Sequence, residues 1–341
     1  AEHRNIMDAK KGKVLLVIDH AINWYDKFKK ITLINGEPII VEQTRWKSIE
    51  LLESCSEQGV KLLLRKEENP FPFSSQKEDR EVIPDFLLVR NFPTGLHDGS
   101  FLNIVLGLMF ANLPSVNNLH SIFMCQHRPL VHAELLKIHK QLQTQFPSIS
   151  VIPTRYFPNW NDEKPPSAPG LLKAPSSYNE YPKVVKVGTC HAGYGKSVAH
   201  KPSDFYDLQS ILMMGRQYFT TEPFVDFDYE FRIQKLGKHC RGFKRKSETS
   251  WKSNWGELSF EVMPLEERHI KWIDECSKLF GGMDICALDV LVAKDGRETI
   301  IELNDTAIGL LYDTEKEDSD HIKELVLERM NQTFCPQQNE N

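Results

Sequence analysis

A predicted β-hairpin near the C-terminus constrains the fold most, because its register brings two carboxylates together. Asp295-Gly296 is a strong signal for a two-residue turn between two strand-forming runs. With this turn at the tip, Lys294 faces Arg297. The same register places Asp289 directly opposite Glu302. Like charges that face each other across strands destabilise a sheet, so the pair indicates that a cation lies between them.

The hairpin face that carries Glu302 also carries Asn304, because side chains two residues apart in a strand point the same way. Oxygen ligands of this kind hold hard cations, and Mg²⁺ often combines carboxylates with substrate phosphates. We therefore predict a Mg²⁺ or Ca²⁺ site at Asp289, Glu302 and Asn304. The alternative is a solvated hairpin face with acidic residues at random. The opposed register argues against that alternative.

A glycine-rich segment supplies groups that bind phosphates. A buried strand is predicted before a turn that contains Gly193 and Gly195 and is flanked by Lys186 and Lys196. Glycines let backbone N–H groups approach phosphate oxygens, and lysine adds a point charge. The segment is not a P-loop, because Cys190 stands where that motif requires a glycine. An ordinary flexible turn is the alternative.

Composition narrows the class of protein. The 341 residues carry a formal net charge of −5 with mixed signs, which is no signature of nucleic-acid binding. The seven cysteines show no C-x-x-C spacing, so reduced thiols in a cytosolic protein are expected rather than zinc ligands. No apolar run reaches the length of about 18 residues that a membrane helix needs. These features predict a soluble, enzyme-like globule whose membrane contacts are at most peripheral.

The N-terminal region shows the alternation of strands and helices that is typical of an open α/β layer. Its strands are predicted at 13–18, 60–64 and 86–89, and its helices at 43–58 and 98–111. This pattern predicts a doubly wound α/β domain over 12–118.

The remainder of the chain has a different texture. A helix begins behind Pro129, with apolar residues at helical spacing at Leu130, Ala133, Leu136 and Leu142. Other predicted elements are a solvated loop at 159–182, strands over 218–246, and helices at 265–280 and 316–330. Two strand-rich lobes that hold a nucleotide between them account for this order.

Short segments in collinear order over about residues 12–330 resemble one protein family. They lie at 84–90, 113–121, 181–186, 221–226, 232–235, 251–254 and 280–287. The chain resembles the ATP-grasp superfamily and, more closely, the central ATP-binding C domain of the synapsins. The resemblance implies a mixed α/β (α+β) ATP-grasp fold with an N-terminal pre-ATP-grasp domain at 12–118, an ATP-grasp domain at 119–335, and flexible ends at 1–11 and 336–341.

The same resemblance carries expectations about function. Synapsin C domains bind ATP with a divalent cation, self-associate, and lie peripherally on the cytosolic face of synaptic vesicles, where synapsins regulate neurotransmitter release. We therefore expect ATP, Mg²⁺ or Ca²⁺, a homodimer or homotetramer, and no nucleic-acid partner. One alternative is an active carboxylate–amine ligase, in which ATP phosphorylates a carboxylate and an amine attacks the acylphosphate. Another is a vesicle scaffold in which nucleotide only regulates self-association.

The resemblance assigns nucleotide contacts residue by residue. Lys186 matches the lysine that reaches the α and β phosphates, and Gly193, Gly195 and Lys196 match the loop that closes over the triphosphate. Glu222, Phe224 and Val225 match the adenine hinge, and Glu230 stands where the superfamily places a ribose-binding carboxylate. The positions expected to line the phosphate end are Arg232, Arg245, Lys252 and Asn254.

Three positions depart from the family pattern. Synapsins have lysine where this chain has Arg128, which we also place among the nucleotide-binding residues. They have glutamate where this chain has Asp289, and an apolar residue where it has Asn304. The last two changes resemble catalytic ATP-grasp ligases, which hold Mg²⁺ with an acidic residue followed by Glu-x-Asn. If the chain transfers phosphate, we expect Asn304 to be catalytic together with Arg245, which the resemblance places at the phosphate end.

Overall fold

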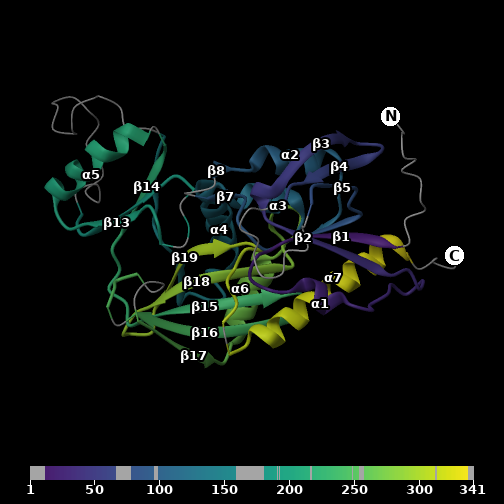
Figure 1. Cartoon of the computed structure of the whole chain (residues 1–341). Helices are drawn as coiled ribbons and strands as arrows, with labels where there is room; N and C mark the ends of the chain where they lie inside the picture. The colour runs from purple at the N-terminus through teal and green to yellow at the C-terminus, as the bar shows by residue number, and fades with distance from the viewer. Residues whose placement is uncertain are drawn as a thin grey trace.

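The computed structural model describes residues 12–66, 78–95, 99–158, 180–189, 191, 193–215, 217–247, 249–252, 257–311 and 313–336. Three parts are visible in Figure 1: an N-terminal α/β part, a large and mostly antiparallel sheet, and a small lobe that carries α5 (Pro202–Gly215). The predicted ends, apart from residue 336, and nearly all of the predicted loop at 159–182 lie outside the described residues. Within the described ranges, no helix is long and apolar enough to span a bilayer.

A parallel sheet forms the centre of the N-terminal part. The elements here are β1 (Lys13–Ile18), α1 (Trp24–Phe28), β2 (Ile39–Thr44), η1 (Trp46–Ser48), β3 (Ile49–Cys55), β4 (Gly59–Leu64), β5 (Arg80–Val82), β6 (Phe86–Val89), β7 (Thr94–Gly95), β8 (Gly99–Ser100), α2 (Leu102–Phe110), β9 (Ser115–Val116) and α3 (Leu119–Cys125). The order β2-β1-β6-β9 is parallel throughout. The predicted strands β1 and β6 and the predicted helix α2 are confirmed.

The predicted helix at 43–58 is wrong. That stretch contains the end of β2, the short η1 and the whole of β3, which pairs with β4 in a separate three-stranded sheet. A helix would have buried Leu52 beside Ile49, yet Leu52 is 41% exposed. The chain instead reverses at Gly59, whose φ of 85° lies in the left-handed region that glycine tolerates. Tertiary packing therefore overrides the helical spacing of the apolar residues.

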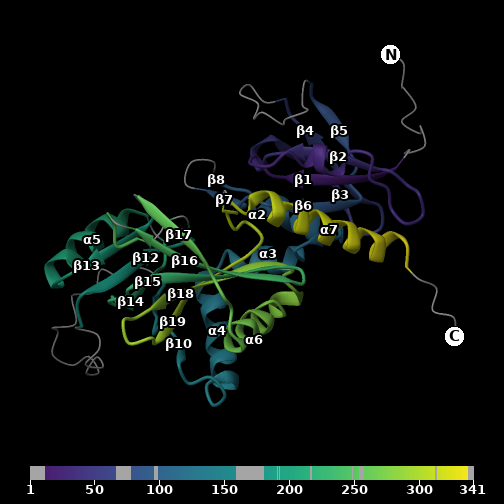
Figure 2. The same ribbon diagram turned by 90° about the horizontal axis from the view of Figure 1, so that it is seen from below.

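Both faces of the parallel sheet are covered. Helix α7 (Glu315–Phe334) crosses one face, although it is the last helix of the chain (Figure 2). Its residues Ile322 and Val326 belong to the same apolar cluster as Leu15 and Leu88. On the other face, α2 and the β3–β4 hairpin pack against alternate strand residues. Burial on both faces explains why β1 and β6 are continuous apolar runs.

A six-stranded sheet dominates the rest of the molecule. Its strands and the elements that accompany them are α4 (Arg128–Leu142), β10 (Ile149–Val151), β15 (Tyr229–Leu236), β16 (His239–Ser247), β17 (Leu258–Met263), α6 (Glu267–Cys276), η3 (Leu279–Gly281), β18 (Ile285–Val292) and β19 (Glu298–Asn304). The strand order is β10-β19-β18-β15-β16-β17. Helices α4 and α6 cover one face and share an apolar cluster with it (Figure 2). Neither of these helices covers the opposite face of the sheet, which borders the cavity described below.

Helix α4 confirms the helix predicted behind Pro129, but it presents a different face to the core. Leu130 and Leu136, which we expected inside, are 43% and 39% exposed. The buried residues are Val131, Leu135, Ile138 and Leu142. Both sets have helical spacing, and a shift of one residue rotates an apolar stripe by about 100° around a helix. Spacing alone therefore could not decide between them.

The acidic hairpin is confirmed with one correction. Asp289 pairs with Glu302 as predicted, but Lys294 does not face Arg297. The amide of Ala293 donates to the carbonyl of Arg297 instead, which makes the tip three residues long. A β-bulge at Ile301 adds one residue to β19, because the pairing shifts between Asp289 and Val290. The longer tip and the bulge cancel, so the two carboxylates still meet.

The small lobe is a second antiparallel sheet. Its strands are β11 (Arg155–Phe157), β12 (Lys183–Val187), β13 (Lys196–Ala199) and β14 (Phe219–Pro223), in the order β11-β14-β12-β13. Helix α5 joins β13 to β14. The buried strand predicted before the glycine-rich turn is β12, and Lys186 pairs with Lys196 across that turn. Figure 1 shows this lobe standing beside the six-stranded sheet.

Candidate functional site

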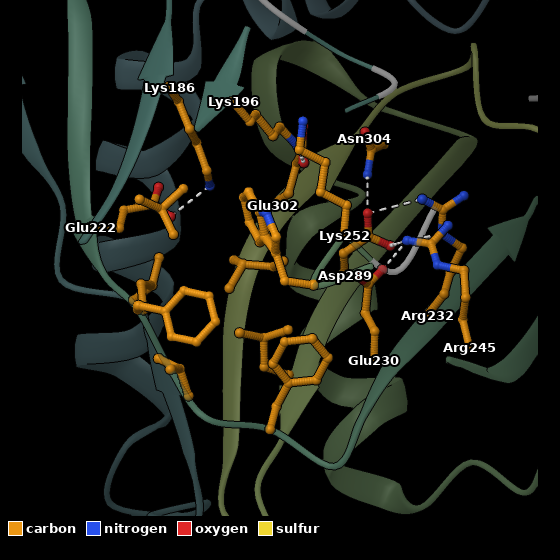
Figure 3. A pocket seen from close by; sticks show the side chains of 18 of the residues that line it. Lys186, Lys196, Glu222, Glu230, Arg232, Arg245, Lys252, Asp289, Glu302 and Asn304 are labelled. Atoms are coloured by element: carbon orange, nitrogen blue, oxygen red, sulfur yellow. Dashed lines mark hydrogen bonds and ion pairs between the residues drawn. The ribbon is translucent and has the colours of Figure 1, made fainter. Parts of the chain in front are cut away.

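A cavity of about 240 Å³ lies between the small lobe and the exposed face of the six-stranded sheet. One end is apolar, and the other end gathers charged side chains from both sheets (Figure 3). Twelve of the residues proposed from the sequence line it: Lys186, Lys196, Glu222, Phe224, Val225, Glu230, Arg232, Arg245, Lys252, Asp289, Glu302 and Asn304. The fold therefore brings together residues that lie more than a hundred positions apart in the chain.

Asp289 is held by two guanidinium groups on neighbouring strands. Arg232 binds it in a bidentate manner, with N–O distances of 2.7 and 2.9 Å. Arg245 lies 3.7 Å away and also pairs with Glu230. The amide nitrogen of Asn304 donates to Asp289 at 2.9 Å. Burial alone would raise the pKa of Asp289, but Arg232 and Arg245 outweigh it and lower that pKa.

Glu302 is neutralised from the opposite side. Arg128 at the start of α4 lies 2.8 Å from one carboxylate oxygen, and Lys196 lies 3.1 Å from the other. Burial opposes ionisation, yet these two cations together with Lys186 hold the pKa of Glu302 well below its ordinary value. Both members of the carboxylate pair are therefore ionised, and protein cations balance them in this arrangement. The metal ligands proposed from the sequence remain a prediction.

Lys186 points into the cavity from β12. It is 5% exposed, and its ammonium lies 2.6 Å from Glu222 on the neighbouring strand β14. Burial lowers the pKa of Lys186, and the Glu222 carboxylate opposes that effect. A buried ammonium with one carboxylate partner retains donors for a second anion.

The glycine-rich turn approaches the cavity through its backbone. Gly193 and Gly195 have φ values of 80° and 61°, which a side chain would strain. Lys252, from the connection between β16 and β17, donates to the carbonyl of Gly193 at 2.8 Å. The turn of one sheet thus contacts a segment attached to the other sheet. Neither Gly193 nor Gly195 is among the residues that line the cavity.

The apolar end of the cavity was only partly foreseen. Phe224 and Val225 follow β14, as the adenine-hinge assignment requires. Trp251 lies beside Phe224, with ring centroids 6.0 Å apart, and was not proposed as a site residue. Leu291 and Ile301 were also missed. The alternation of β18 could have indicated Leu291, since it shares a strand face with Asp289.

One proposed residue is placed differently, and one cannot be compared. Arg128 does not line this cavity; it reaches it only through its ion pair with Glu302. Asn254 lies outside the described residues.

A second cavity of about 120 Å³ adjoins the first and shares Glu222, Glu302 and Asn304 with it. Arg128, His132 and His191 are among its other polar lining residues. Asp305 also lines it, and burial raises the pKa of this carboxyl to about 6. The sequence showed no candidate for such a neighbouring pocket.

The charges at the polar end of the first cavity do not cancel. Among the described residues, five cations and four carboxylates line it, which leaves an excess of one positive charge: Lys186, Lys196, Arg232, Arg245 and Lys252 against Glu222, Glu230, Asp289 and Glu302. Arg128, which pairs with Glu302 from outside the cavity, adds a second positive charge. A nucleoside triphosphate with one divalent cation carries roughly two negative charges. The cavity is therefore electrostatically complementary to that complex.

Comparison with known families covers nearly the whole chain. The model of the synapsin pre-ATP-grasp domain matches residues 8–115, and the model of the synapsin ATP-binding domain matches residues 117–332. The protein named synapsin from Drosophila melanogaster is 34% identical over 330 residues, which are 94% of this chain. The matched region spans 30% of the length of that relative.

Solved structures share the architecture. The VanG D-Ala:D-Ser ligase from Enterococcus faecalis has a TM-score of 0.59 at 12% identity, covering 94% of this chain and 99% of its own. The macrocyclase MdnC bound with precursor peptide MdnA from Microcystis aeruginosa MRC has a TM-score of 0.58 at 16% identity, with coverages of 93% and 99%. A D-alanine–D-alanine ligase from Bacillus anthracis complexed with ATP has a TM-score of 0.55 at 12% identity, with coverages of 94% and 99%.

At these identities the solved structures support the fold alone. The expected ATP-grasp fold with an N-terminal pre-ATP-grasp domain is confirmed, while the exact boundary between the two domains stays a prediction. The chain belongs to the synapsin family, and it contains the ATP-binding domain of that family.

Proposed function

We propose that this domain binds ATP together with one Mg²⁺ or Ca²⁺ ion in the cavity between the small lobe and the six-stranded sheet. The observation that carries the proposal is the polarity of the cavity, with apolar walls at one end and an excess of positive charge at the other. The adenine lies at Phe224 and Val225, and the triphosphate lies at Lys186, Lys196 and the arginines. Asp289, Glu302 and Asn304 hold the ion.

Binding in this proposal is an exchange of partners. Phosphate oxygens replace carboxylates as partners of the cations, and the divalent ion replaces the cations as partner of Asp289 and Glu302. Ion pairs at 2.6–3.1 Å compensate the carboxylates of Glu222, Asp289 and Glu302 before the ligand arrives. The amide of Asn304 presents its oxygen to the ion once it turns about its last side-chain bond.

Replacing Glu302 with glutamine is expected to weaken ATP binding in the presence of metal but not in its absence. In Mg²⁺ the variant should bind ATP at least about tenfold more weakly, because the ion loses a charged ligand. In excess chelator it should bind ATP as well as or better than the wild type, because Arg128 and Lys196 are released from Glu302. Isothermal titration with ATP under both conditions measures the difference.

The matched control is Glu261→Gln, on β17 of the same sheet, where the carboxylate is exposed and 3.8 Å from Lys244. It should behave as the wild type in both conditions. Equal losses of affinity with and without metal in Glu302→Gln would remove the hairpin from the ion site.

We further propose, from membership of the family, that the chain self-associates as a homodimer or homotetramer. We also propose that it acts peripherally on synaptic vesicles in the regulation of transmitter release. Both proposals rest on the family match alone. Sedimentation at micromolar concentration and flotation with vesicles test the two parts separately. A purely monomeric species, or protein that never floats, contradicts the corresponding part.

An active ATP-grasp ligase is the second candidate function. The observation that favours it is the adjoining cavity, which shares Glu302 and Asn304 with the proposed nucleotide site and could hold an acceptor carboxylate beside Arg128. A second ligand at Asn304 would fix the ion between the β and γ phosphates, where Lewis-acid stabilisation of the transferring group matters most. Arg245 is the further candidate for stabilising that group.

Replacing Asn304 with valine separates the two candidates. If the chain transfers phosphate, the wild type hydrolyses ATP slowly with metal, and Asn304→Val lowers turnover more than it lowers ATP affinity. Phosphate release and isothermal titration on the same preparation measure the two quantities. If the wild-type protein hydrolyses ATP no faster than Glu302→Gln, the ligase is contradicted and ATP binding without turnover is the better account.

A further inference from the structure

Two histidines and a glutamate meet away from the cavity, where the turn between β15 and β16 reaches α7. His239 is the first residue of β16, and His321 and Glu324 stand three residues apart on α7. Residues with that spacing share one face of a helix. One possible ligand atom from each of the three residues lies within 4.8 Å of those of the other two. Two elements that are distant in sequence thus present metal-binding groups to one point.

Two ring nitrogens of this cluster lack hydrogen-bond partners. His239 Nε2 and His321 Nδ1 are both buried and take part in no hydrogen bond. Buried polar atoms are normally paired, so two such atoms side by side need an explanation. The imidazole rings are stacked, with centroids 3.5 Å apart and planes inclined by 14°. Binding of one ion by both nitrogens would require the rings to turn out of this stacked arrangement.

The surroundings of His239 favour the metal-binding form of its ring. Burial, His321 and Lys238 lower the pKa of His239. A lower pKa favours the neutral imidazole, which is the form that coordinates metals. The exposed carboxylate of Glu324 supplies a negative ligand.

A carboxylate of the same helix lies near His321 and faces its other ring nitrogen. The Nδ1 atom of His321 lies 3.9 Å from Glu324, and its Nε2 atom lies 3.6 Å from Glu317. Arg241 holds Glu317 at 2.7 Å. With Nδ1 on a metal, the Nε2–H group donates toward Glu317. A histidine that binds a metal through one nitrogen usually donates through the other to such a carboxylate.

We propose that His239, His321 and Glu324 form a binding site for a divalent transition metal of the zinc type. Two imidazoles and one carboxylate are a ligand set that zinc uses, with water in the fourth position. Imidazole favours such metals over Mg²⁺ and Ca²⁺, which prefer oxygen ligands. The site is therefore chemically distinct from the ion site proposed at the acidic hairpin. A bound ion would join the β15–β16 turn to α7.

Zinc titration of the untagged protein tests this proposal. The wild type is expected to bind Zn²⁺ one to one, and Co²⁺ in its place should give the visible absorption of a low-symmetry site. His239→Gln and His321→Gln should each weaken Zn²⁺ binding by at least about tenfold. Glu324→Gln should weaken it too, and because this residue is exposed on a helix the variant tests the site even if a histidine variant misfolds.

Two controls make the result specific. His200→Gln removes an exposed histidine at the end of the small lobe and should leave Zn²⁺ affinity unchanged. Glu302→Gln should also leave it unchanged, which separates this site from the proposed ATP site. The proposal is overturned if the wild type binds no Zn²⁺ at about 100 μM, a concentration that saturates any site of micromolar affinity. It is equally overturned if all three ligand variants bind Zn²⁺ as tightly as the wild type.

Discussion

Replacing Lys186 with methionine is expected to weaken ATP binding by about a hundredfold or more in the presence of Mg²⁺. The ammonium is almost fully buried and lies 2.6 Å from Glu222, so it faces the cavity with little competition from water. Truncating one member of a buried, hydrogen-bonded charge pair typically costs about 2–5 kcal/mol of binding energy. Isothermal titration measures the loss. Lys183→Met on the same strand is the matched control, because Lys183 does not line this cavity.

The same substitution should also destabilise the fold, because it leaves Glu222 buried without its cation. Breaking a buried ion pair from one side costs about 3–5 kcal/mol. The double variant Lys186→Met/Glu222→Gln removes both charges and should recover most of that stability without recovering ATP affinity. Recovery of both together would mean that Lys186 supports the sheet rather than the phosphates.

Replacing Asn117 with alanine is expected to lower the free energy of unfolding by about 2–5 kcal/mol. Its fully buried amide donates to the carbonyl of Ile285 and accepts from the amide of Ile285, both at 2.7 Å. These bonds join the end of β9 to the first residue of β18. Alanine leaves a buried N–H and a buried C=O unpaired, at about 1–3 kcal/mol each. Chemical denaturation of the variant measures the loss.

The adjacent Asn118 provides the matched comparison. Its side chain accepts from the amide of His120 at the start of α3, as a helix cap does. Loss of such a cap costs about 1 kcal/mol. Asn118→Ala should therefore be clearly milder than Asn117→Ala. Equal losses of unfolding free energy in the two variants would mean that water reaches Ile285 and replaces the amide of Asn117 as its hydrogen-bond partner.

The acidic hairpin shows how a local pattern can predict a contact for incomplete reasons. The turn signal located the tip and the alternation located the carboxylates. The pairing of Asp289 with Glu302 is nevertheless correct only because a three-residue tip is offset by a bulge at Ile301. Neither feature has a clear local signal. The bulged residue lines the cavity, and cavities are where such irregularities commonly occur.

Other predictions failed where long-range packing decides the outcome. The apolar residues of 43–58 allow a helix or a hairpin, and the neighbouring strands β4 and β5 select the hairpin. In α4 two apolar stripes were available, and the facing α6 and six-stranded sheet select one of them. Most of the charged residues of the cavity were named from the resemblance to the synapsins, and only the hairpin carboxylates, Lys186 and Lys196 from a local pattern. Their partners, such as Arg128 for Glu302, depend on distances that no local pattern contains.

Arg90, just beyond the end of β6, links the N-terminal part of the molecule to the segment that follows β19. Its guanidinium donates to the carbonyls of Thr306 and Ile308, and the hydroxyl of Thr306 donates back to the carbonyl of Val89. Ala307, Ile308 and Gly309 form part of the cavity wall. A ligand that binds only the folded cavity stabilises whatever unfolds together with that wall. By thermodynamic linkage, a ligand in the cavity is expected to raise the stability of the N-terminal part as well, although that part need not contact the ligand.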